Sequence, residues 1–292
     1  MKSGFASIVG RPNSGKSTLL NRLVGEKVSI VTNKPQTTRR VVKGIVTRPE
    51  GQVVFLDTPG IHKPIHRMNE RMMRSVRGAV AEVDLILLIV DVSAAFGRGD
   101  AFTLELLSPV STKKFVLLNK IDRVQKSTLL PIIERYSKSS FEEIIPISAL
   151  TGENVENLLA QIFKHMPEGQ MFYPPDQISD QQERTIAAEI IREKLILLTE
   201  EELPYSTAVV IDRFEESDHL YRIYATIYAE RESQKSILIG KSGQKLKDAG
   251  IAARRELESW FNRKIFLELH VKVKKHWRDD EETLRTLGLG EN

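Results

Sequence analysis

The sequence predicts two domains, an α/β domain with a mainly parallel sheet followed by a smaller α+β domain. A length of 292 residues suits roughly two domains. In the first 165 residues, short apolar runs alternate with helical patterns, which is typical of parallel strands with helices on both faces. A segment rich in proline and glycine, 166–177, interrupts this alternation, and a different order of elements follows it.

The strands expected in the first domain are short and apolar, and the helices between them show apolar residues at helical spacing. We place the strands at 5–9, 41–47, 53–57, 85–91, 114–119 and 144–147. We place the helices at 16–24, 68–80, 100–108, 128–138 and 153–165. The first domain is therefore expected at 1–167, and the proline-rich residues make 168–182 a stiff linker.

The second domain, expected at 183–292, begins with a long amphipathic helix over 182–198. Two alternating segments, 207–214 and 221–229, predict antiparallel strands. A short apolar run ending at Ile239, a loop, a helix over 244–261 and a strand over 265–273 follow. The order helix–strand–strand–helix–loop–helix–strand predicts a small α+β domain.

Composition limits the classes of protein to which this chain can belong. It has no cysteine, so disulfides and cysteine-ligated zinc are excluded, which suits a reducing cytosol. The longest apolar run, 85–90, is far shorter than a membrane span. No signal peptide fits ahead of the first strand, and we expect a cytoplasmic protein.

The formal charge of +4 is unevenly distributed. Residues 1–170 carry +8 and residues 171–292 carry −4, yet the stretch 231–278 within the second part carries +8 by itself. Such a basic block indicates either a surface that binds a polyanion or an ordinary solvated face, and charge alone does not decide between them.

The run Gly10–Ser17 carries the most specific chemical signal in the chain. It matches G-x-x-x-x-G-K-[ST] and lies between a predicted strand and a predicted helix, as a phosphate-binding loop must. Its backbone N–H groups would cradle phosphates, Lys16 would reach the β- and γ-phosphates, and Ser17 would bind Mg²⁺. A plain glycine-rich turn is the alternative interpretation.

A second motif, Asn119–Asp122, predicts that the base of this nucleotide is guanine. It follows the apolar run 115–118, at the carboxyl end of a strand, where open α/β sheets bind ligands. The Asp122 carboxylate can accept hydrogen bonds from N1–H and the 2-amino group of guanine, neither of which adenine offers. We expect Asn119 to join the base and phosphate loops, the Lys120 stem to cover the base, and Ser148 and Ala149 to donate N–H groups to guanine O6.

Two further segments would complete the metal site. Asp57–Gly60 closes an apolar run, so Asp57 would hold Mg²⁺ through water and the Gly60 N–H would sense the γ-phosphate. Thr37 or Thr38, in the segment 36–40, would complete the Mg²⁺ shell when a triphosphate is bound. The sequence leaves open which threonine does so. The expected nucleotide-binding residues are Gly10, Arg11, Pro12, Asn13, Ser14, Gly15, Lys16, Ser17, Thr18, Asp57, Thr58, Pro59, Gly60, Ile61, Asn119, Lys120, Ile121, Asp122, Ser148 and Ala149.

In this order and spacing the segments resemble a Ras-like small GTPase domain, and 10–13, 36–39 and 57–61 resemble the translation-factor-related bacterial GTPases. Ras-type enzymes orient the attacking water with a glutamine where this chain has Ile61. In related GTPases an asparagine at the position of Asn13 ligates K⁺, so the resemblance implies the same role here, with a turn-forming residue as the alternative. The residues expected to contribute to hydrolysis are Lys16, Asn13, Thr37, Thr38 and Gly60.

The second domain contains a G-x-x-G loop at Gly240–Gly243, between an apolar run and a helix. In KH domains such a loop clamps about four nucleotides of RNA. The element order resembles the type II KH arrangement, and basic residues continue along the following helix. The expected RNA-binding residues are Ile239, Gly240, Lys241, Ser242, Gly243, Lys245 and Lys247.

A Ras-like GTPase domain joined to a KH domain resembles the Era family of bacterial GTPases, and the resemblance extends to 188–194, 202–205, 267–274 and Trp277. It implies a GTP-hydrolysing switch that binds the 3′ end of 16S rRNA, acts in assembly of the 30S subunit, and associates weakly with the cytoplasmic side of the cell membrane. An RNA-binding assembly factor with a structural nucleotide, or another ribosome- or tRNA-associated GTPase, is the alternative.

Overall fold

The protein is described from a computed structural model that covers residues 1–199 and 203–289. The chain divides into two compact units. The first comprises Met1–Val31, Thr38–Pro64 and Met72–Asp180, and the second comprises Thr32–Thr37, Ile65–Arg71 and Gln181–Asn292. Residue 202 of the expected segment 202–205, and residues 290–292 of the expected second domain, lie outside the described residues.

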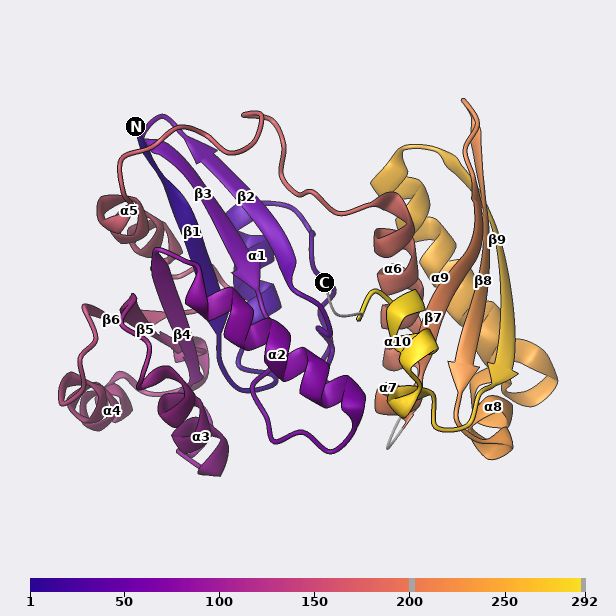
Figure 1. Cartoon of the computed structure of the whole chain (residues 1–292), viewed down its shortest axis with the longest axis horizontal. Coiled ribbons are helices and arrows are strands. Elements are labelled where there is room, and N and C mark those ends of the chain that lie inside the picture. Colours follow the sequence, from indigo (N-terminus) through magenta and orange to yellow (C-terminus); the bar gives the residue numbers. More distant parts are fainter. Residues whose placement is uncertain (200–202, 290–292) are drawn as a thin grey trace. The chain divides into compact units, whose positions relative to one another are not determined.

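The first unit contains a six-stranded sheet in the order β2-β3-β1-β4-β5-β6 (Figure 1). β2 pairs antiparallel with β3, and the other neighbouring strands pair in parallel, which confirms the predicted mainly parallel sheet. Pro49 and Glu50 alone join β2 to β3, a connection too short for a parallel crossover. The strands are β1 (Lys2–Val9), β2 (Val42–Arg48), β3 (Gly51–Asp57), β4 (Leu85–Asp91), β5 (Lys113–Asn119) and β6 (Glu143–Ile147).

Five helices cover both faces of the sheet (Figure 1). Of these, α1 (Lys16–Val24), α2 (Arg67–Ala81), α3 (Arg98–Leu107) and α4 (Leu129–Ser137) lie between successive strands, whereas α5 (Val155–His165) follows β6. On one face, Leu20 of α1 and Ile162 of α5 pack with inward residues of the strands. On the other, Val76 of α2 and Tyr136 of α4 do so. Because strand side chains alternate between faces, nearly every residue of the central strands is buried.

The segment 168–180, expected to be a linker, belongs to the first unit and is hydrogen-bonded to β2 and β3. The backbone N–H of Ile45 donates to Ile178 O at 2.8 Å. Gln52 is completely buried, and its Oε1 accepts from the N–H groups of Phe172 at 2.8 Å and Tyr173 at 3.0 Å. Its Nε2 donates to Tyr173 O at 2.9 Å. The segment thereby covers part of the open edge that β2 presents.

The second unit is a three-stranded sheet in the order β7-β8-β9. β7 and β8 are antiparallel, as predicted, whereas β8 and β9 are parallel. α6 and α9 cover one face of the sheet (Figure 1). The elements are α6 (Glu183–Leu197), α7 (Leu203–Ser206), β7 (Ala208–Glu215), β8 (Leu220–Ala229), α8 (Glu232–Ile239), α9 (Gln244–Phe261), β9 (Lys264–Val273) and α10 (Glu281–Thr286).

The helices α7 and α10 were not predicted, because each is too short to show a helical period. Asp280 caps α10 by accepting from the N–H of Thr283 at 2.9 Å. Trp277 is fully buried and its Nε1 donates to Ser206 O at 2.9 Å, which secures the end of α7. Across residues 1–199 and 203–289, no helix has the length and apolar character that crossing a membrane requires.

We expect Gln52→Leu to release the segment 168–180, because the buried amide satisfies two N–H groups and one carbonyl that leucine cannot. Losing these bonds costs about 1–3 kcal/mol of unfolding free energy. Hydrogen exchange should accelerate at residues 172 and 173, and the thermal midpoint should fall. The exposed Gln125→Leu is the matched control. Unchanged exchange at 172 and 173 would contradict this account.

Candidate nucleotide and nucleic-acid sites

The phosphate-binding loop lies at the carboxyl edge of the first sheet, where β1, β3, β4, β5 and β6 all end (Figure 1). Neither Gly15 in this loop nor Gly60 beside it has space for a side chain. A Cβ on Gly15, whose φ is +102°, would lie 2.3 Å from Asn119 Nδ2. A Cβ on Gly60 would lie 2.8 Å from three atoms of Pro12. The loop is therefore held between the base-reading strand end on one side and the Asp57–Gly60 segment on the other.

Lys16 is a buried cation at the start of α1. Its Nζ donates to the carbonyl oxygens of Arg11 at 2.9 Å and Gly10 at 3.3 Å. Burial lowers the pKa of Lys16 to about 8, and the charge of Asp57 opposes this shift. An anionic phosphate would raise that pKa again, so nucleotide binding above pH 8 would take up a proton.

A cluster of oxygen atoms surrounds Asp57. Its Oδ2 accepts from Ser17 Oγ at 2.6 Å and from Ser29 Oγ at 3.0 Å, and Ser17 Oγ lies 2.9 Å from Thr38 Oγ1. Burial raises the pKa of Asp57, with Lys16 and the hydroxyl groups opposing it. Its Oδ1 is buried without a hydrogen-bond partner among the described residues.

These oxygens suit Mg²⁺, which prefers oxygen ligands and commonly uses one or two carboxylates together with substrate phosphates. The orphaned Oδ1 of Asp57 is the atom that such an ion, or its water, would satisfy. Within the described ranges no group of three or more histidine, cysteine or acidic residues could hold a metal by itself. The Thr37 hydroxyl instead donates to Lys34 O at 2.7 Å.

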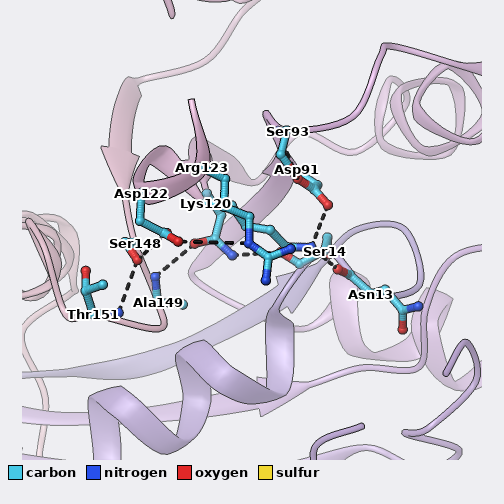
Figure 2. Close-up of polar contacts among 11 residues, drawn as sticks. Asn13, Ser14, Asp91, Ser93, Lys120, Asp122, Arg123, Ser148, Ala149 and Thr151 are labelled. Carbon is cyan, nitrogen blue, oxygen red and sulfur yellow. Dashed lines mark hydrogen bonds and ion pairs between the residues drawn. The ribbon is translucent and has the colours of Figure 1, made fainter. Parts of the chain in front are cut away.

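The base-reading residues form a connected network (Figure 2). Asn119 Nδ2 donates to Ser14 O at 2.8 Å, and its Oδ1 accepts from the N–H of Ala149 at 2.9 Å. Ser148 Oγ donates to Asp122 Oδ1 at 2.6 Å, which orients the carboxylate expected to read guanine. Lys120 has a left-handed backbone, with φ of 70°, and its Nζ donates to Asn13 O at 2.8 Å.

Ile61 lies beside the site with only its backbone directed to it. Its N–H donates to Gly10 O at 3.0 Å, while its side chain is buried in the apolar cluster that contains Met73 and Val76. The neighbouring His62 is half-buried, and its Nδ1 lies 2.6 Å from Gly60 O.

Sequence reasoning missed four residues that hold the site. Ser29 donates to Asp57. Asp91 accepts from both Lys120 and Ser93, as Figure 2 shows. Arg22 of α1 donates to the carbonyls of Ala149 and Leu150. Of these residues, only Asp91 could have been predicted from the sequence, because it ends an apolar strand just as Asp57 does.

The second unit has a groove of about 360 Å³ beside the G-x-x-G loop. Leucines of β9 and α9 give it an apolar floor, and Lys247 and Arg254 add positive charge. Such a groove, with glycines that permit close approach of a backbone, suits unpaired bases and their phosphates. Its lining residues are Gly243, Leu246, Lys247, Gly250, Ile251, Arg254, Leu267 and Leu269.

Of the expected RNA-binding residues, Gly243 and Lys247 line this groove, and the other five do not. Lys241 and Ser242 are exposed, and Ile239, Gly240 and Lys245 are half-buried. Gly240 has φ of +74°, and a Cβ there would lie 2.7 Å from Cβ of Lys245, so only glycine fits. The β9 leucines were not expected, since a sequence does not reveal which strand lies beside the loop.

Comparison with known proteins identifies relatives of the whole chain. A family model for the 50S ribosome-binding GTPases matches residues 5–120, and a KH domain model matches residues 202–278. The chain is 48% identical over 293 aligned residues to the GTPase Era of Staphylococcus haemolyticus, covering 100% of this chain and 98% of that protein. It is 47% identical to the GTPase Era of Staphylococcus epidermidis with the same coverage.

Two solved structures match the entire chain at 41% identity, covering 100% of both chains. One is a variant of Aquifex aeolicus Era bound to GDP·AlF₄⁻, with a TM-score of 0.95. The other is Era in complex with MgGDPNP and nucleotides 1506–1542 of 16S ribosomal RNA, with a TM-score of 0.96.

We predict that the lowered pKa of Lys16 makes the nucleotide-free protein more stable as pH rises from about 8 to 10.5. In that window the unfolded lysine holds a proton that the folded lysine has lost, so the free energy of unfolding increases with pH. Relative to Lys16→Met, the wild type should gain up to about 2–3 kcal/mol, measured by denaturant unfolding across this range. A difference between the two proteins that does not change with pH would refute this assignment.

Proposed function

The chain belongs to the Era family of GTPases, and from that membership we propose that it is a GTP-driven switch that binds the 3′ end of 16S rRNA and acts in assembly of the 30S subunit. One observation carries the nucleotide part. Lys16, the Ser17–Thr38–Asp57 oxygen cluster and the Asn119–Asp122 network share one sheet edge. That edge joins phosphate binding, metal binding and guanine recognition in one site.

We propose the role of each residue in GTP hydrolysis from its position in this site. Lys16 would donate to the β- and γ-phosphates, and the Gly60 N–H would approach the γ-phosphate. Ser17 and Thr38, rather than Thr37, would ligate Mg²⁺, supported by the 2.9 Å between their hydroxyls. When bound, Mg²⁺ would neutralise negative charge on the phosphates. The remaining predicted residues of the loop and of the base network would bind and orient the nucleotide.

The RNA part of the proposal rests on the KH groove and on a relative. The groove combines an apolar floor with Lys247 and Arg254, which suits stacked bases beside a phosphate backbone. Era, to which this chain is 41% identical, has been solved with nucleotides 1506–1542 of 16S ribosomal RNA. A place in the cytoplasm, with weak peripheral contact to the cell membrane, belongs to the same proposal and is supported by family resemblance alone.

We propose further that Asn13 holds a K⁺ ion that assists hydrolysis. Asn13 is exposed, lies in the phosphate loop and has φ of 62°. Ile61 buries its side chain in the core and offers no polar atom to an attacking water. Another group must therefore supply what a Ras-type glutamine supplies.

The RNA proposal predicts that Lys247→Gln and Arg254→Gln each weaken binding of a 3′-end 16S rRNA oligonucleotide several-fold. Each should reduce the slope of log affinity against log salt by about 0.7–1, because one phosphate contact is lost. Fluorescence anisotropy measures both quantities, and the exposed Lys138→Gln of the first unit is the control. Unchanged affinity in both groove variants would exclude the groove, and equal affinity with GDP and a GTP analogue would exclude nucleotide control.

The K⁺ proposal predicts that hydrolysis is faster in KCl than in NaCl at equal ionic strength, and that Asn13→Ala loses this difference. A loss of about tenfold or more is expected, because electrostatic stabilisation of the transferring phosphoryl group is a large part of catalysis. Single-turnover hydrolysis with radiolabelled GTP reports the rate. Equal rates in both salts, or K⁺ stimulation that survives in Asn13→Ala, would rule it out.

A further inference from the structure

Asp91 occupies a defined place beside the base-reading motif. It is the last residue of β4 and pairs in register with Asn119, the last residue of β5. The N–H of Val92 donates to Asn119 O at 3.0 Å, which fixes the two strand ends against each other. Asp91 belongs to none of the motifs that identified the nucleotide site.

The Asp91 carboxylate is held from both sides. Its Oδ1 accepts from the N–H of Ser93 at 3.0 Å and from Ser93 Oγ at 2.5 Å, and its Oδ2 accepts from Lys120 Nζ at 2.5 Å. Burial opposes ionisation of Asp91, but the bonds from Lys120 and Ser93 outweigh it and hold its pKa below the usual range. Both side chains are only about one-fifth exposed, so water screens this pair less than a surface pair.

Lys120 carries this contact on to the phosphate loop. The same ammonium that binds Asp91 donates to Asn13 O at 2.8 Å (Figure 2). Asn13 has a left-handed backbone, a conformation that costs energy for a residue other than glycine and needs support. The chain Ser93–Asp91–Lys120–Asn13 therefore connects the end of β4 to the loop that binds phosphate.

We propose that Asp91 is a positioning residue for guanine nucleotides. Its carboxylate fixes Lys120, so that the lysine stem lies along the base site and the ammonium supports the Asn13 carbonyl. Without Asp91, the Lys120 side chain would lose rotamer freedom when nucleotide binds, and this entropy loss would weaken binding. Because Asp91 already holds Lys120 in the nucleotide-free protein, binding no longer carries that cost. The inference rests on the nucleotide binding common to the family and is independent of the proposed RNA target.

Asp91→Asn tests the inference, because asparagine has the same shape and can keep the Ser93 contacts but lacks the charge. Dissociation of mant-GDP, followed by stopped flow, should accelerate about tenfold, as expected for loss of a charge-assisted hydrogen bond, with little change in association. The thermal midpoint of the nucleotide-free protein should fall only slightly, because the ion pair with Lys120 is lost while the Ser93 contacts remain. Asp176→Asn, an exposed residue of the segment 168–180, should have no effect.

A double-mutant cycle with Lys120→Met separates positioning from a structural role. Methionine keeps the apolar stem and removes the ammonium, so Asp91→Asn should then change dissociation less than about twofold. Ser93→Ala, which removes only one donor to Asp91, should give a smaller acceleration than Asp91→Asn. Unchanged dissociation in Asp91→Asn, or an equal acceleration with and without Lys120, would overturn the inference.

Discussion

The nucleotide site depends on one buried amide, the side chain of Asn119. It occupies the space next to Gly15, donates to Ser14 O of the phosphate-binding loop and accepts from the Ala149 N–H. It thereby joins loops that follow three different strands. Any side chain at position 15 would displace Asn119 and separate these loops. A buried amide with both ends satisfied is stable, whereas one left unpaired would destabilise the fold.

The sheet makes this arrangement rigid. Parallel strands buried on both faces bring Val9, Asp57, Asp91, Asn119 and Ile147 to one edge, and the apolar clusters on either side keep them there. The same burial gives Lys16 its lowered pKa and Asp57 its raised one, so the site holds two charged groups whose natural partners are phosphate and a metal ion. The fold and the chemistry thus have a common cause in desolvation at the strand ends.

Sequence patterns predicted the sheet, its helices and the residues at the strand ends. The contacts that they missed have physical reasons. Strand ends such as Asp57 and Asn119 were predicted because a motif coincided with the end of an apolar run. Arg22 and Ser29 were missed because their contacts depend on tertiary packing, which no local period records. The sequence left Thr37 and Thr38 open, because the contact of Thr38 Oγ1 with Ser17 Oγ depends on how the loop that carries both threonines turns. The fastening of 168–180 depends on Gln52, a polar residue whose complete burial its pattern does not reveal.

The most direct test of the central claim compares Gly15→Ala with Gly25→Ala. Both glycines have φ near +90°, so alanine strains both backbones, but only Gly15 faces Asn119, and a Cβ on Gly25 meets open space. The measurement is the equilibrium dissociation constant for mant-GTP. The account predicts a loss of about a hundredfold or more for Gly15→Ala, with nearly wild-type affinity for Gly25→Ala, because displacing Asn119 separates the base and phosphate loops. Equal, small losses in both variants would contradict it.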